Sequence, residues 1–233
     1  EMAEEKIAER IDANLFDIDI ADVENLPKST FDTKMNKIKS RTNGKLIVKE
    51  YPTAVAHAGH FRALLEELKL KKDFKPDVIF IDYLNIAASS RMKGLGGAIN
   101  SYTNVKAIAE ELRGLAVEYD VPLWTATQVN RTGFGSSDVE ITDTSESFGL
   151  PATCDLMIAL ISTEQLEGMN QLMVKQLKNR YNDPTVNKRF VVGIDRAKMR
   201  LYDVEDSAQS LSSGAPSAPG GNSTESDFSS FKI

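Results

Sequence analysis

The sequence predicts an α/β fold with a mainly parallel sheet that is flanked by helices. Short apolar runs rich in branched side chains, at residues 78–81 and 121–129, are typical of strands buried on both faces of a parallel sheet. Amphipathic helices are predicted over residues 60–72 and 101–119. Because helices alternate with strands along the chain, the order favours parallel pairing.

The composition is that of an ordinary soluble globular protein of 233 residues, with 41% hydrophobic and 27% charged residues. No apolar stretch approaches the ~20 residues that span a bilayer, and the N-terminus does not resemble a signal peptide, so we expect a cytoplasmic location and no membrane partner. The single Cys154 excludes a disulfide within the chain and is more typical of a buried thiol than of a nucleophile. A net charge of −6 argues against a protein that binds DNA through its whole surface. It permits a small group of basic residues that line a channel.

The first part of the chain predicts a helix over residues 2–14, a second helix over about 31–41, and a strand over 45–51. Ser29 and Thr30 are suited to cap the second helix. The chain begins with Glu1 rather than Met, which predicts a cleavage product, a split-gene product or a trimmed chain.

The apolar run within residues 77–86 ends at Asp82, where open α/β sheets bind their ligands. This pattern is typical of a Walker B strand, whose Asp holds the Mg²⁺ of a bound nucleotide. The alternative, which the pattern alone leaves open, is a buried strand whose Asp caps the next segment. The following strand carries Gln128 at its end, where a side chain can reach a γ-phosphate, although most glutamines are simply solvated.

The second half of the chain predicts strands over residues 155–162 and 171–178, and an antiparallel hairpin over 188–204 at the edge of the sheet. Lys178 and Arg180 precede a polar turn, from which cations can project into a neighbouring subunit and stabilise a transferring phosphoryl group. The alternative is a pair of solvated surface cations.

Residues 205–233 predict a disordered tail after a folded domain at 1–204, because nine of these last 29 residues are serine and several others are Pro or Gly. The final segment, 227–233, is either a frayed terminus or a short peptide ligand for a partner.

In their order these segments resemble the RecA-like motor domain of DnaB-type hexameric replicative DNA helicases, and most closely those of tailed phages. The likeness covers roughly residues 1–203, and the order of the motifs is more specific than any one of them. The matching stretches are Glu1-Met2, Asp77–Ile86, Asn104–Arg113, Leu123–Arg131, Asp143–Leu160 and Lys175–Pro184.

The resemblance implies an ATP-dependent helicase in which each matching residue has a role. Glu1 would be the general base that orients water, and Asp82 would hold Mg²⁺. Gln128 would sense the γ-phosphate. Arg180 would be an arginine finger acting in trans, with Lys178 as its companion.

The resemblance also implies that the loops at 88–100 and 130–148 face a central channel and bind single-stranded DNA through its phosphates, without base readout. It implies a homo-hexameric ring, 5′-to-3′ movement, and contacts with a primase and a helicase loader. The candidate DNA-binding residues are Arg91, Lys93, Arg131, Thr132 and Glu146.

One expected motif is missing, because no Gly-x-x-x-x-Gly-Lys-Ser/Thr phosphate-binding loop (P-loop) occurs in the chain. We therefore expect this chain alone to hydrolyse little ATP. Two alternatives stay open: a RecA-like ATPase of another kind, such as a recombinase, and a non-enzymatic split-gene subunit used for docking or assembly.

Overall fold

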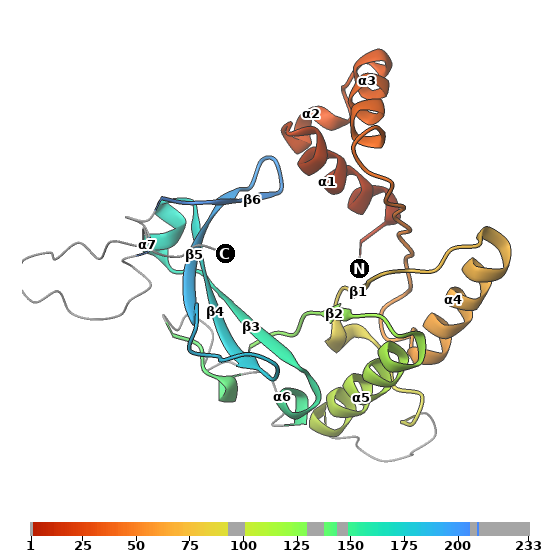
Figure 1. Cartoon of the computed structure of the whole chain (residues 1–233), viewed down its shortest axis with the longest axis vertical. Coiled ribbons are helices and arrows are strands. Elements are labelled where there is room, and N and C mark those ends of the chain that lie inside the picture. Colours follow the sequence, from red (N-terminus) through yellow and green to blue (C-terminus); the bar gives the residue numbers. More distant parts are fainter. Residues whose placement is uncertain (1, 93–100, 130–137, 144–148, 206–208, 210–233) are drawn as a thin grey trace, which may run out of the picture.

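A computed structural model gives the fold of the chain and describes residues 2–92, 101–129, 138–143, 149–205 and 209 (Figure 1). Within these ranges the α-helices are α1 (Glu4–Phe16), α2 (Ile20–Val23), α3 (Lys28–Lys39), α4 (Ala58–Lys72), α5 (Ser101–Tyr119), α6 (Gly149–Thr153) and α7 (Glu164–Gly168). Two short 3₁₀ helices are η1 (Leu84–Ile86) and η2 (Ile141–Asp143). The strands are β1 (Ile79–Ile81), β2 (Leu123–Thr125), β3 (Leu156–Ile161), β4 (Gln171–Asn179), β5 (Arg189–Asp195) and β6 (Arg200–Asp203).

The first sheet is the parallel pair of β1 and β2, joined through helix α5. Ile79 lies opposite Leu123, and Phe80 lies opposite Trp124. A parallel pair needs a long crossover, and α5 provides it. The predicted α/β class and the βαβ order are therefore confirmed.

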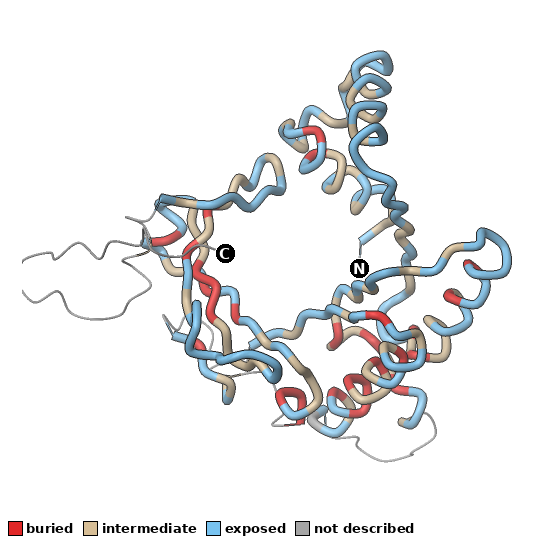
Figure 2. The backbone as a smooth tube through the Cα atoms, in the orientation of Figure 1, coloured by how far each residue is buried: buried red, intermediate tan, exposed pale blue. Residues whose placement is uncertain are grey.

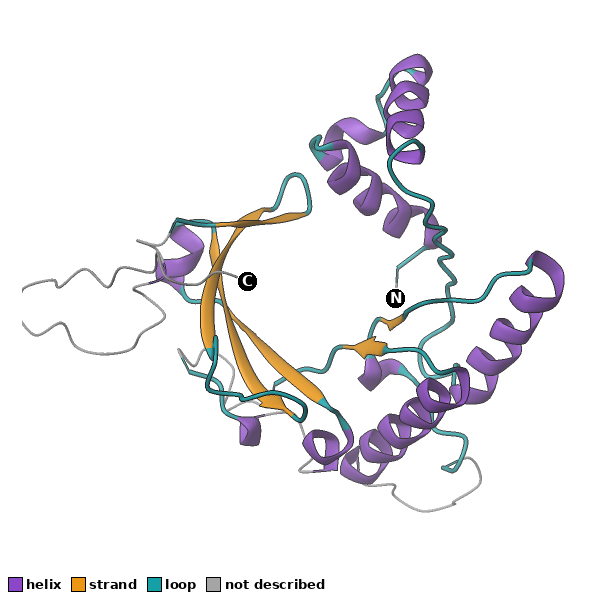
Figure 3. Cartoon of the chain, viewed as in Figure 1, coloured by secondary structure: helices purple, strands orange, loops and turns teal. Residues whose placement is uncertain are grey.

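The second sheet is antiparallel, with its strands in the order β3-β4-β5-β6 (Figures 1 and 3). A register shift between Met157 and Ile158 marks a β-bulge in the pairing of β3 with β4. The predicted hairpin over 188–204 is confirmed as β5 and β6, and the antiparallel part also includes β3 and β4.

Helix α5 builds the core next to β1 and β2. Its stripe at Val105, Ile108 and Leu112 is buried, as the helical spacing predicts, and packs against Leu84 from η1. Phe61, Ile81, Leu123 and Met157 pack against this cluster from α4, β1, β2 and β3. One face of the parallel pair is covered in this way.

The antiparallel sheet has its own core, which lies between the sheet and the segments that flank it. Val139, which precedes η2, and Leu166 from α7 pack against Ala159, Met173 and Val191 of the sheet. The segment that precedes η2 is thus anchored on the strands by an apolar side chain.

Helices α1 to α3 form a separate group at one end of the chain (Figure 1), where the rings of Phe16 and Phe31 meet edge to face. This group contacts the turn between β5 and β6. Asn14 donates to the Met199 carbonyl at 2.7 Å, and Asp17 forms an ion pair with Arg200 at 3.0 Å.

Three local expectations were wrong. Residues 45–51 form no strand, because no described segment pairs with them. Helix α3 begins at Lys28 after Pro27, so Ser29 and Thr30 lie inside its first turn rather than at its cap. Strands β1 and β2 cover only residues 79–81 and 123–125, and the predicted burial of both their faces fails because Phe80 and Trp124 are 71% and 45% exposed. Figure 2 shows that the buried residues gather along α5 and the antiparallel strands.

The predicted disordered tail falls almost wholly outside the described residues, as does most of the predicted loop at 130–148. Gln209 is described, and its side-chain amide pairs with the backbone N–H and C=O of Val191 at 2.8 and 2.9 Å. The domain boundary after residue 204 stays a prediction.

Candidate functional site

The carboxyl ends of β1 and β2 are tied together by hydrogen bonds between the segments that follow them. The Leu84 N–H donates to the Ala126 carbonyl at 3.0 Å, and the Thr127 hydroxyl donates to the Asn85 side chain at 2.9 Å. In open α/β sheets this end of the strands is where ligands bind.

Asp82 and Gln128 both lie at this sheet end. Asp82 directly follows β1, and its carboxylate is exposed. Gln128 lies three residues beyond β2, and its amide Nε2 donates to the hydroxyl of Tyr83 at 3.2 Å. The predicted metal-holding carboxylate and the predicted phosphate sensor are therefore linked through the single residue that follows Asp82.

The residues at this end fit a magnesium ion that is shared with a nucleotide. Magnesium is often bound through one or two carboxylates together with substrate phosphates, rather than in a protein cage. The described part of the chain holds no cluster of three or more His, Cys, Asp or Glu side chains that could enclose a metal. A single exposed Asp82 suits the shared arrangement.

The two predicted cations, Lys178 and Arg180, stand at the end of β4. The Lys178 ammonium is turned inward and donates to the carbonyls of Pro151 and Cys154 at 2.6 and 2.8 Å. Arg180 is the more accessible of the two, with a side chain that is 59% exposed.

Sequence reasoning missed the residue that holds Arg180. Asp155 accepts from Arg180 Nη1 at 3.1 Å, and it also forms an ion pair with Arg113 of α5 at 2.8 Å. The hydrogen bond from Arg113, together with that from Arg180, keeps the pKa of Asp155 below its usual value. No periodic signal marks Arg113 in its helix, so the sequence alone could not have identified this cluster.

Sequence reasoning also missed Lys175, which is only 1% exposed in the middle of β4. Its ammonium donates to Asp138 Oδ1 at 2.6 Å, to the Val139 carbonyl at 2.7 Å and to Glu140 Oε1 at 2.7 Å. All three of its N–H groups are satisfied, as a buried charge requires. A signal was present, because this lysine interrupts an apolar run.

Of the predicted DNA-binding residues, only Arg91 lies within the described part of the chain. Its guanidinium is engaged by Glu110 at 2.9 Å and by Glu111 at 3.5 Å. A phosphate would therefore have to compete with these carboxylates for Arg91. Lys93, Arg131, Thr132 and Glu146, and the predicted general base Glu1, lie outside the described residues.

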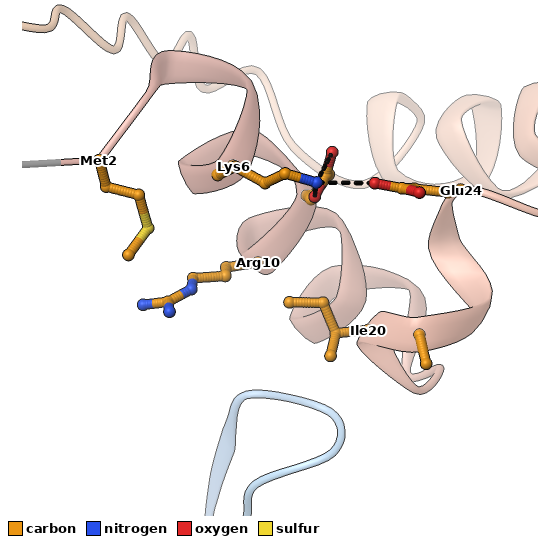
Figure 4. Close-up of a pocket in the computed structure, with 7 residues that line it drawn as sticks. Met2, Lys6, Arg10, Ile20 and Glu24 are labelled. Atoms are coloured by element: carbon orange, nitrogen blue, oxygen red, sulfur yellow. Dashed lines mark hydrogen bonds and ion pairs between the residues drawn. The ribbon is translucent and has the colours of Figure 1, made fainter.

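A shallow pocket lies elsewhere, between α1 and α2 (Figure 4). Lys6 at its wall is held by Glu9 and Glu24, at 2.8 and 2.7 Å. Its lining contains none of the predicted site residues. We therefore place the candidate site at the sheet end rather than in this pocket.

Comparison with known proteins connects this geometry to one family. Residues 1–190 match the model of the DnaB-like helicase C terminal domain. The chain belongs to this family. A DnaB-like replicative helicase of Enterobacteria phage T4 is 47% identical over 208 residues, which are 88% of this chain and 43% of that protein. The chain thus spans less than half the length of this DnaB-like relative.

Two solved structures share the fold of this DnaB-like domain. One is an ATPase domain, which superposes with a TM-score of 0.71 at 16% identity, covering 88% of this chain and 72% of that one. The other is a DnaB-like replicative helicase, studied with its interactions with primase, which superposes with a TM-score of 0.69 at 16% identity, covering 88% of this chain and 49% of that one. The predicted RecA-like fold and family resemblance are confirmed.

Proposed function

We propose that this chain is the part of an ATP-driven replicative DNA helicase that carries the metal-holding Asp82, the sensor Gln128 and the trans-acting Arg180. The observation that carries the proposal is the link from Gln128 through Tyr83 to Asp82 at the carboxyl end of β1 and β2. A group placed in this way can respond to a phosphate bound beside Asp82.

At the nucleotide, Asp82 would hold Mg²⁺, which neutralises charge on the β- and γ-phosphates when it is bound. Gln128 would exchange its bond to Tyr83 for one to the γ-phosphate, and so move the segment that follows it. Arg180 would stabilise the transferring phosphoryl group at the site of an adjacent subunit. Glu1, as the general base, would complete the site.

We propose that the P-loop is supplied by a segment that residues 1–233 do not include. The exposed apolar face of the parallel pair supports this view, because Phe80 and Trp124 are cross-strand partners with 71% and 45% exposure. Apolar surface of this kind is typical of a face that another segment covers. We propose that the P-loop segment of the same enzyme covers it.

The wider assembly follows from the family. We propose a homo-hexameric ring that moves 5′-to-3′ on single-stranded DNA in the bacterial cytoplasm and contacts a primase and a loader. The similar structure that was studied with primase supports a primase partner. Arg91, Lys93, Arg131, Thr132 and Glu146 would lie in the DNA-facing loops. The described helices include none that is long and apolar enough to cross a bilayer.

The test compares this chain alone with the same chain joined to the P-loop segment of a DnaB-like helicase. We expect background ATP turnover and no unwinding of a forked duplex from the chain alone, and both activities from the joined protein. Equal turnover by the chain alone would overturn the proposal.

The two alternatives give different outcomes in the same test. Turnover without unwinding by the joined protein indicates a RecA-like ATPase of another kind. Binding to the P-loop segment without any gain in turnover indicates a docking subunit. The likeness to a phage replicative helicase favours unwinding.

A further inference from the structure

Asp155 joins three elements of the fold near the end of β4. It lies between α6 and β3, and its carboxylate accepts from Arg113 on α5 and from Arg180 just beyond β4. The backbone adds a further tie, because the Arg180 N–H donates to the Asp155 carbonyl at 2.9 Å. Both the main chain and the side chain of Arg180 are therefore placed relative to Asp155.

Arg113 fixes the position of the carboxylate independently of Arg180. Its Nη1 donates to Asp155 Oδ2 at 2.8 Å, and its Nη2 donates to Oδ1 at 3.1 Å. Such two-point pairs between guanidinium and carboxylate define orientation as well as distance. Nη1 of Arg113 also donates to the Thr153 carbonyl at 2.7 Å, which ties the pair to the end of α6. Asp155 would keep its place if Arg180 moved.

Within the described part of the chain, the guanidinium of Arg180 is held at one of its donors. Nη1 bonds to Asp155 Oδ1, and among the described residues Nε and Nη2 of Arg180 have no hydrogen-bond partner. A guanidinium offers its donors along separate edges of a rigid plane, so one edge can be anchored while another receives a phosphate. Lys178 is less suited to this role, because two of its three N–H donors already bond to backbone carbonyls.

We propose that Asp155 is a positioning residue that anchors one edge of Arg180, so that the free edge faces the nucleotide of the adjacent subunit. Arg113 supports Asp155 in this role as a fixed clamp. The inference rests on the proposed function of Arg180 and deepens it, since it names the side chain that orients the finger.

The test measures ATP turnover in the active helicase that contains this chain together with its P-loop. For Asp155→Asn we expect kcat to fall about tenfold while KM for ATP changes less than about twofold, because a misplaced finger affects the transition state more than nucleotide binding. Asp155→Glu keeps the carboxylate and should recover part of the loss. Asp203→Asn, an exposed carboxylate on β6 of the same sheet, is the matched control and should be neutral.

The double variant separates positioning from a general structural effect. If Asp155 acts through Arg180, adding Asp155→Asn to Arg180→Ala lowers the residual turnover no further. A loss of the same size in both backgrounds shows a structural role and overturns the inference. If Asp155→Asn does not fold, Arg113→Lys replaces it, because this change weakens the pair with Asp155 more gently. Arg113→Lys must then lower turnover when Arg180 is present and must not lower it further in the Arg180→Ala background.

The two proposals fail in different ways. If Arg180→Ala leaves turnover unchanged, the proposed function of Arg180 is wrong and this inference is lost with it. If Arg180→Ala abolishes turnover while Asp155→Asn behaves as the unchanged protein, only the positioning role is wrong.

Discussion

The amide of Gln128 donates to the hydroxyl of Tyr83 at 3.2 Å, so the residue directly after Asp82 is bonded to the segment that follows β2. The bond joins two strand ends that are 45 residues apart in the sequence. It gives Gln128 a defined resting partner, which a bound γ-phosphate would replace.

Replacing Tyr83 by Phe removes this partner and keeps the ring. We expect the stimulation of ATP turnover by single-stranded DNA to fall several-fold in the active helicase, because Gln128 loses its resting position. The free energy of unfolding should change by less than about 1 kcal/mol, because the bond joins an exposed amide to a neutral hydroxyl. Steady-state kinetics with and without DNA check this, and unchanged stimulation would show that the bond is incidental.

Lys175→Met should destabilise the antiparallel sheet strongly. The lysine is buried, and its removal takes away the donor to the buried Val139 carbonyl, which costs about 2 kcal/mol. The carboxylates add less, because Asp138 and Glu140 are 45% and 63% exposed and Asp138 also pairs with Arg189. Chemical denaturation of the chain measures the loss, and Lys188→Met, at an exposed cation just before β5, is the control. A loss below about 1 kcal/mol would mean that this cluster contributes little.

Mixed rings test whether Arg180 acts in trans. One protomer carries Arg180→Ala and the other carries Asp82→Asn. Relative to the unchanged protein, the uniform Arg180→Ala ring should turn over at least about 1,000-fold more slowly, and the uniform Asp82→Asn ring at least about 100-fold more slowly. Some interfaces in a mixed ring join an intact Asp82 to an intact Arg180 from the neighbour, so turnover should recover in part. If mixing recovers nothing, Arg180 serves its own protomer or is not a finger.

The ion pair of Asp155 predicts a dependence of stability on pH. The hydrogen bond from Arg113, with that from Arg180, lowers the folded pKa of Asp155 below its usual 3.8. The stabilisation is therefore complete above about pH 5 and is lost as the pH falls through the folded pKa. The difference in free energy of unfolding between the unchanged chain and Asp155→Asn should shrink below pH 4. A constant difference from pH 6 to pH 2.5 would exclude an ionic contribution.

The four longer helices and the antiparallel strands could be predicted because their apolar spacing is regular, whereas the short helices α2, α6 and α7 were not predicted. Helix α5 has the predicted bounds, since one stripe from Val105 to Leu115 faces the core along its whole length. Strands β3 and β4 differ from prediction by one residue at their ends. Tertiary packing reinforced the local pattern in each case.

The prediction from strand propensity was wrong where the fold provides no partner strand. Lys45–Tyr51 alternates like a strand, yet its backbone stays a loop that is held at Lys49 and Glu50 by the carboxylate of Glu4. Strand β1 is shorter than its apolar run, because η1 turns the chain directly after Asp82 and Tyr83. A single sequence shows the tendency to extend but not the presence of a neighbour.

Residues of the candidate site could be predicted only where a polar side chain follows the end of a predicted strand. Asp82 and Gln128 were named because each ends an apolar run. Asp155 and Arg113 were given no role, because their pairing joins a loop to a helix 42 residues apart in the sequence. Long-range ion pairs of this kind leave no periodic trace.

The most direct measurement of the central claim is the rate of ATP turnover after Asp82→Asn in the active helicase. Asparagine keeps the shape of the side chain but removes the charge that would hold Mg²⁺. We expect turnover to fall at least about 100-fold. The control is Asp77→Asn, which changes an exposed carboxylate just before the start of β1 and should leave turnover unchanged. If both variants hydrolyse ATP at the unchanged rate, the carboxyl end of β1 and β2 is not the nucleotide site.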